Sequence, residues 1–260
     1  MSIPGYAELE FNLPEALLHS LVATFAQIDM SPLTTANTSK IPNEQGVYQL
    51  HLKCSEDDST ALVYIGKTDS DAGLRSRLGR HAKRLRGRVN LQPEDVFFKA
   101  IRLYVFTAMD LETELIRHYG GVREIPWNHS GFGANDPGKA RDTTTYKSDH
   151  FDTQFPIDLD SALVPIAPGT YLVSEIMRCL KDKLPYLLRY QRPAQSRNSC
   201  HPDFESSRVT LVAGMSTRQV IEYCVRVLPA GWHATALPSH VIAYKDDTRR
   251  FPSGTLIAES

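Results

Sequence analysis

The amino-acid sequence predicts an α+β protein: a short mixed or antiparallel sheet flanked by helices, with an N-terminal helix before it and a second small α+β domain after it. Residues 45–52 and 61–66 are strand-like runs joined by a polar segment, which indicates a hairpin. Residues 74–85 carry leucines at helical spacing. Further helix and strand patterns follow a polar, acid-containing linker at 142–160, so we expect two domains in the 260 residues.

The first domain is expected to open with an amphipathic helix that has Pro14 near its start. The connector after this helix is rich in Thr, Ser, Asn and Pro, and the last helix of the domain ends at Gly120 and Gly121. In order, the expected elements are a helix at 8–30, a connector at 31–42, the hairpin, a helix at 74–85, a strand at 97–106, a helix at 109–119 and a glycine-rich loop at 126–138. The resulting bounds are 1–43 for the helix and connector and 44–145 for the core.

The second domain is expected to span 160–260. Residues 171–190 have a helical pattern, although Pro185 should kink or break it. A strand at 209–213 precedes a helix that Ser216 should cap, and 232–244 should supply strands around Pro238. No cluster of chemically reactive side chains is apparent in this part of the sequence.

Overall composition excludes several classes of protein. The formal net charge is -1, and the four cysteines have no CxxC spacing, so neither a disulfide scaffold nor a zinc site is expected. The apolar stretches are too short for a membrane span, and the N-terminus does not resemble a secretion signal. These features favour an intracellular, reduced, soluble protein. The neutral average hides a basic run, because seven Lys and Arg residues and no acidic residue fall within the fourteen positions 75–88.

The first half contains several side chains suited to acid–base chemistry. Tyr48 and Tyr64 lie in the two strands of the predicted hairpin. Arg77 and His81 are four residues apart, a spacing that lets one helix present a guanidinium and an imidazole to the same site. Glu112 lies in a later predicted helix and could anchor a divalent metal such as Mg²⁺, which prefers oxygen ligands and keeps much of its hydration.

These residues stand in a series of motifs that resembles the GIY-YIG nuclease superfamily, over roughly residues 44–142. The glycine-rich tail of the match is similar to the type II restriction endonucleases of that superfamily. Each motif alone is weak, but five in family order are specific. They are Gly46–Tyr48, Val63–Lys67, the helix with Leu74, Arg77, Leu78 and His81, the helix with Glu112, Leu115 and Ile116, and Pro126–Asn128.

The resemblance implies a role for each matched residue. Arg77 would stabilise the phosphate, Tyr48, Tyr64 and His81 would handle the attacking water and its proton, and Asn128 would orient the site. The implied cofactor is Mg²⁺ or Mn²⁺ at Glu112. A tyrosine that acts as a general base needs a lowered pKa, because its reference pKa is about 10. We expect the positive charges of Arg77, Lys67 and the metal to lower it. Either tyrosine could be the base.

The metal ligand has an alternative. The distance from Glu112 to Asn128 exceeds the compact family spacing, with Gly120 and Gly121 in the extra loop, and Glu114 lies close by. Glu112 is favoured because it stands where the motif requires a carboxylate. Glu114 would point about 200° round the helix from it.

The basic run is expected to bind the DNA backbone, since like charges at helical spacing repel each other unless a polyanion neutralises them. Loop residues near the site could contact bases or phosphates. The candidate DNA-binding residues are Lys67, Arg75, Arg80, Lys83, Arg84, Arg86, Arg88, Arg123, Asn135, Lys139 and Arg141.

The sequence therefore predicts a Mg²⁺-dependent, sequence-specific type II restriction endonuclease that cuts double-stranded DNA in a prokaryotic cytoplasm, away from membranes. Cutting both strands favours a homodimer on a palindromic site, and a DNA methyltransferase would be the functional partner. Two alternatives remain: a repair or mobile-element nuclease of the same superfamily, and a non-catalytic DNA-binding protein.

Overall fold

The computed structural model describes residues 12–54, 59–68, 72–104, 110–132, 139–193 and 199–260. The chain forms two compact units, Met1–Ala82 with Glu94–His129 and Lys83–Pro93 with Ser130–Ser260. The second unit thus begins earlier than 160 and includes a segment of the first half. The α+β class and the N-terminal helix are confirmed. No helix in these described ranges is long and apolar enough to cross a membrane.

The first unit is built on a four-stranded antiparallel sheet with the order β1-β4-β2-β3. The predicted hairpin supplies two of its strands. β2 lies inside the sheet, because it pairs with both β4 and β3, and β3 forms one edge. The strands are β1 (Ser31–Pro32), β2 (Gly46–Lys53), β3 (Thr60–Lys67) and β4 (Val96–Arg102).

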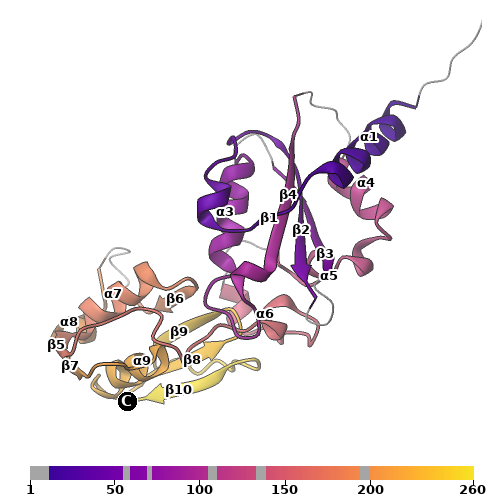
Figure 1. Cartoon of the computed structure of the whole chain (residues 1–260). Helices are drawn as coiled ribbons and strands as arrows, with labels where there is room; N and C mark the ends of the chain where they lie inside the picture. The colour runs from indigo at the N-terminus through magenta and orange to yellow at the C-terminus, as the bar shows by residue number, and fades with distance from the viewer. Residues whose placement is uncertain (1–11, 55–58, 69–71, 105–109, 133–138, 194–198) are drawn as a thin grey trace, which may run out of the picture. The chain divides into compact units, whose positions relative to one another are not determined.

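Helices cover both faces of this sheet, with α3 on one side and α1 and α4 on the other (Figure 1). Leu21 and Phe25 of α1 pack with Val47, Ile65 and Leu115 in the core beneath α1 and α4. The helices and 3₁₀ turns are α1 (Leu13–Gln27), α2 (Thr35–Thr38), α3 (Leu74–Arg84), η1 (Pro93–Asp95), α4 (Leu111–His118), η2 (Val122–Glu124) and α5 (Pro126–His129).

The start of α3 is fixed by the segment that precedes β2. Asn43 accepts a hydrogen bond from the Ser76 backbone N–H over 2.9 Å, and the Leu74 N–H donates to the Glu44 carbonyl over 2.8 Å. These bonds satisfy N–H groups that have no partner within the helix. At Gly73, a Cβ atom would lie 2.2 Å from the Asn43 carbonyl carbon, so only glycine permits this close approach.

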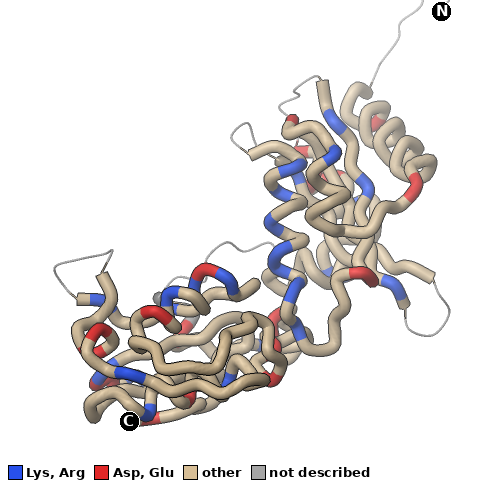
Figure 2. Tube along the Cα trace, turned by 60° about the vertical axis from the view of Figure 1, so that its left-hand side comes forward, with Lys and Arg blue, Asp and Glu red and all other residues tan. Residues whose placement is uncertain are grey.

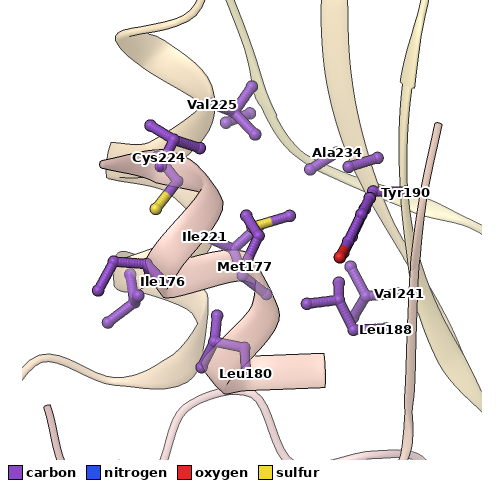
Figure 3. Packing of buried hydrophobic residues seen from close by; sticks show 14 of the residues in the cluster. Ile176, Met177, Leu180, Leu188, Tyr190, Ile221, Cys224, Val225, Ala234 and Val241 are labelled. Carbon is purple, nitrogen blue, oxygen red and sulfur yellow. The ribbon is translucent and has the colours of Figure 1, made fainter. Parts of the chain in front are cut away.

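The second unit packs α7 and α9 against a four-stranded sheet with the order β10-β8-β9-β6, in which only the β6–β9 pair is parallel. Figure 3 shows Met177 and Ile221 of the helices facing Leu188 and Val241 of the strands. The elements are η3 (Lys139–Asp142), α6 (Phe151–Gln154), β5 (Gly169–Leu172), α7 (Val173–Lys183), β6 (Leu187–Tyr190), α8 (Pro202–Ser206), β7 (Arg208–Leu211), α9 (Thr217–Arg226), β8 (Trp232–Leu237), β9 (His240–Lys245) and β10 (Thr255–Glu259).

Two expectations for this unit are wrong. The segment 142–160 is not a linker between two domains, because it lies within the second unit and its residues Asp142, Phe151 and Asp152 are fully buried. Asp142 accepts hydrogen bonds from Arg189, His240 and Tyr244, so a buried polar network replaces solvent. The region 171–190 is not helical throughout: α7 ends at Lys183, just before Pro185 as expected, but β5 precedes it and β6 follows it, and these strands pair with β7 and β9.

The other expectations for the second unit fare better. The helix capped by Ser216 is confirmed, and the Ser216 side chain accepts from the Gln219 backbone N–H. Strands around Pro238 are also confirmed as β8 and β9. The edge strand β10, which pairs with β8, was not predicted.

Candidate active site

Two tyrosine side chains lie beside each other on one face of the first sheet. Tyr48 pairs with Gly66 and Leu50 pairs with Tyr64 across β2 and β3, so both tyrosines point to the face that α3 covers. Their ring centroids are 6.0 Å apart, and 0% and 5% of their surfaces are exposed. The hairpin therefore holds two phenolic side chains together in a buried place.

Gly66 makes room for the Tyr48 ring. A Cβ atom at position 66 would lie 2.4 Å from the Tyr48 hydroxyl oxygen and 2.5 Å from the ring carbon that bears it. Glycine within a strand often marks such a close approach. The Tyr48 hydroxyl can therefore occupy its position only because β3 has no side chain opposite it.

Helix α3 brings Arg77 and His81 to that same hydroxyl. The Tyr48 oxygen lies 2.7 Å from His81 Nε2, and Arg77 Nε donates to it over 3.4 Å. Since the oxygen accepts from Arg77, its own proton can be donated to Nε2 of a neutral His81. The His81 ring also meets the Tyr64 ring at a centroid distance of 5.4 Å. Two side chains one helical turn apart thus share one cluster with both tyrosines.

The surroundings keep both tyrosines neutral. Burial raises the pKa of Tyr48 far above its usual range, the charges of Tyr64 and Glu112 raise it further, and Arg77 offsets only part of the rise. Burial and then the charge of Glu112 also raise the pKa of Tyr64. The protein's own groups therefore raise the pKa of both tyrosines, because the loss of hydration outweighs the guanidinium. The expected lowering by a bound metal stays a prediction. Lys67 forms an ion pair with Asp110 at 2.9 Å.

Of the two carboxylates considered on α4, Glu112 is the one whose charge reaches the tyrosines. Glu112 is half-buried, and its charge contributes to the raised pKa of both Tyr48 and Tyr64. Glu114 is instead engaged by Arg117, whose Nη1 lies 2.7 Å from each carboxylate oxygen. Glu112 is thus associated with the tyrosine cluster through its charge.

Asn128 acts on the backbone of β3. Its Oδ1 accepts from the Ile65 N–H over 2.7 Å, and its Nδ2 donates to the Ile65 carbonyl over 2.8 Å. Because β3 is an edge strand, the carboxamide takes the place of a further strand at the residue next to Tyr64. Asn128 therefore holds the strand that carries Tyr64. It lies in the short helix α5, where a loop was expected.

The donor set limits which metal could bind. No group of three or more His, Cys, Asp or Glu side chains that could hold a metal occurs in the described part of the chain. A structural zinc site would need such a group. Mg²⁺ is often bound by one or two carboxylates together with water and substrate phosphates. A single carboxylate from Glu112 would therefore suit Mg²⁺ only together with water and a phosphate from a substrate.

The basic run does not form one surface. Figure 2 shows Lys and Arg residues following one another along α3. Arg75, Arg80, Lys83 and Arg86 are exposed, as are Lys67 and Arg123. Arg75 Nε donates to the Ile41 carbonyl over 2.8 Å.

Arg84 and Arg88 correct the sequence interpretation. Arg88 is buried and donates to Asp152 over 2.8 Å, and Arg84 reaches the other Asp152 oxygen at 3.3 Å. Burial would raise the pKa of the Asp152 carboxyl, but the charges of the two arginines outweigh it and lower that pKa. Both arginines pair with the single Asp152 carboxylate within the second unit, and Arg88 is also buried, so the two do not stand as exposed, unpaired cations for DNA.

Some predicted residues fall outside this description. Asn135 and the side chains of Lys139 and Arg141 lie outside the described residues. Conversely, sequence reasoning missed Asn43 and Thr68, which fix the ends of the elements around the site. Thr68 Oγ1 accepts from the Gly46 N–H over 2.8 Å. The partners of both residues are more than twenty positions away, so no local pattern could have revealed them.

No protein-family model matches this chain, and no curated protein matches its sequence.

Proposed function

We propose that this protein is a Mg²⁺-dependent, sequence-specific endonuclease for double-stranded DNA, of the type II restriction kind in the GIY-YIG superfamily. The observation that carries the proposal is the Tyr48 hydroxyl held between His81 Nε2 and Arg77 Nε, at 2.7 and 3.4 Å. The cluster combines a hydroxyl, a proton acceptor and a guanidinium, the groups that hydrolysis of a phosphodiester requires.

A neutral Tyr48 can serve as a proton relay. When water attacks phosphorus, the Tyr48 oxygen takes the water proton while its own proton passes to His81 Nε2. No free phenolate forms, which agrees with the raised pKa of Tyr48. Tyr64 packs against both Tyr48 and His81, and Tyr48 is fully buried, so the relay requires that the attacking water be admitted to this pair. His81 is the final proton acceptor in this scheme.

Arg77 supplies the positive charge next to the relay. Burial alone would lower its pKa, but its bonds and charge interactions with Tyr48 and Tyr64 outweigh burial and raise it. The guanidinium is therefore cationic at any working pH and can bind a non-bridging phosphate oxygen. Bound at Glu112, Mg²⁺ would supply Lewis-acid stabilisation of charge on the phosphate and the leaving oxygen.

The biological setting is part of the proposal. An enzyme with one such cluster per chain cuts both strands of a palindromic site as a two-fold dimer. Its functional partner would be a DNA methyltransferase that protects the same site in a prokaryotic cytoplasm.

The test is incubation of purified protein with unmethylated plasmid or phage DNA, with Mg²⁺ in one reaction and EDTA in the other. Discrete fragments that appear only with Mg²⁺ would support the proposal and allow the site to be mapped. A smear would refute sequence specificity. DNA left intact in both reactions would refute restriction, and cutting confined to flaps or junctions would favour a repair nuclease.

A further inference from the structure

The second unit has a concave basic site of its own. A pocket of about 300 Å³ opens where the turn after α3 meets the end of α7. The end of α3 and the turn after it contribute Lys83, Arg86 and Gly87 to the lining. The end of α7 and the residues after it contribute Asp182, Lys183 and Pro185. All of these residues belong to the second unit.

The wall of this pocket is rigid where the two segments touch. Gly87 has a φ of +64°, and a Cβ there would lie 2.6 Å from Pro185 Cγ and 3.1 Å from Leu163 Cδ1. The Gly87 carbonyl accepts from the Asp158 N–H over 2.9 Å. The neighbouring Arg88 is anchored to Asp152, so the turn that carries Arg86 is held from behind. The cations at the rim therefore stand on a preorganised frame.

The charges of the pocket are not balanced by ion pairs. Lys83, Arg86 and Lys183 are exposed, and within the described ranges none of them forms an ion pair, in contrast to Arg84 and Arg88. The only carboxylate that lines the pocket is Asp182. The C-termini of α3 and α7 each add roughly -0.5 charge at the pocket. This partial negative charge stabilises one cation at the end of each helix. Three cations, one carboxylate and two helix ends leave about one positive charge.

We propose that this pocket binds a backbone phosphate of the DNA substrate, which makes the second unit a sequence-independent anchor. The inference rests on the proposed function. One net positive charge matches one phosphodiester, and Lys and Arg contacts to phosphate position a protein without reading sequence. The residues that line the pocket include no aromatic ring on which a base could stack, so a free nucleotide would have only its phosphate held. Lys83 also belongs to the same helix as Arg77 and His81.

The test measures binding of a short DNA duplex by the full chain in EDTA, over a range of salt concentrations. For the double variant Arg86→Ala with Lys183→Ala, we expect weaker binding and a salt slope smaller in magnitude by about 0.9, the value for one lost phosphate contact. Asp182→Asn should bind more tightly, a gain that a misfolded protein could not show. Lys147→Ala, which removes an exposed lysine elsewhere in the second unit, should match the wild type.

Each result separates this inference from the proposed function. A wild-type protein that binds no DNA at any salt concentration refutes the nuclease proposal and, with it, the anchor. DNA binding with the same affinity and slope in wild type, double variant and Asp182→Asn overturns the anchor alone. Inorganic phosphate serves as the second probe. If phosphate stabilises the wild type but not the double variant, while their DNA binding is equal, the pocket holds free phosphate and the DNA assignment is wrong.

Discussion

Removing one oxygen atom tests the proton relay at Tyr48. Tyr48→Phe keeps the ring that fills the space opposite Gly66 but deletes the hydroxyl held by His81 and Arg77. General acid–base groups contribute typically about 10² to 10⁴-fold to a rate, so we expect the cleavage rate to fall by that factor. DNA binding in EDTA should be unchanged, because Tyr48 is fully buried.

The same change has a cost in stability that must be separated from catalysis. His81 is 5% exposed, and the variant removes the hydroxyl 2.7 Å from its Nε2. Leaving a buried polar group without its partner costs about 1–3 kcal/mol in the free energy of unfolding. Tyr186→Phe is a matched control, because the Tyr186 hydroxyl, in the second unit, donates to the Asp158 carbonyl over 2.8 Å and is also buried. It should lose similar stability and keep its cleavage rate.

Three measurements check this prediction: initial rates of plasmid cleavage, urea unfolding, and duplex binding in EDTA. The relay is refuted if Tyr48→Phe cleaves within about threefold of the wild-type rate while folded. It is also refuted if Tyr186→Phe loses as much activity, because the loss would then follow stability and not the hydroxyl.

Three further changes test the site and its supports. Glu112→Gln should abolish Mg²⁺-dependent cleavage, whereas Glu114→Gln should only break the exposed pair with Arg117; the reverse result in cleavage assays would move the metal ligand to Glu114. Asp152→Asn should lower the free energy of unfolding by about 3–5 kcal/mol in urea titrations, because it leaves a buried arginine without its counter-charge; a loss below about 1 kcal/mol would contradict this. Burial, and then the charge of Lys99, lowers the pKa of His51 to about 4, so the unfolded chain binds a proton that the native one does not, and wild-type stability should fall as pH drops from 6.5 to 4. In His51→Gln the free energy of unfolding should fall less over this pH range. The difference should stay below about 3 kcal/mol, since His51 is half-buried and solvent screens part of its charge. The same fall in wild type and variant would refute the assignment.

Local patterns predicted the parts of the site that depend on local geometry. The alternation of β2 and the glycine in β3 indicated the hairpin, and the spacing of Arg77 and His81 indicated that they share a helix face. Side chains repeat on one face every two residues in a strand and roughly every 3.6 residues in a helix, so such features can be read from the spacing of residues in the sequence. The choice of Glu112 over Glu114 came instead from its place in the motif of the resembled family, and the phase of the helix only separated the two side chains.

Partners distant in sequence could not be predicted in the same way. The polar, acid-containing composition of 142–160 indicated a linker, yet Asp142 bonds Arg189 and His240, which are 47 and 98 positions away. Arg84 and Arg88 indicated a DNA-binding stripe, but both pair with Asp152, 68 and 64 positions away. Charge composition predicts exposure only when no tertiary partner exists. For this reason the exposed cations of the basic run could not be separated from the buried ones by sequence.

The raised pKa of the two tyrosines bears on how the site could be activated. Burial is the first cause for both, and it persists as long as the cluster is closed. The second cause at Tyr64 is the charge of Glu112, which any bound cation would offset and which Glu112→Gln would remove. Tyr48 differs, because its second cause is Tyr64 itself. Neutralising Glu112 should therefore affect the acidity of Tyr64 more than that of Tyr48, which agrees with the proposed relay, in which Tyr48 stays a neutral hydroxyl.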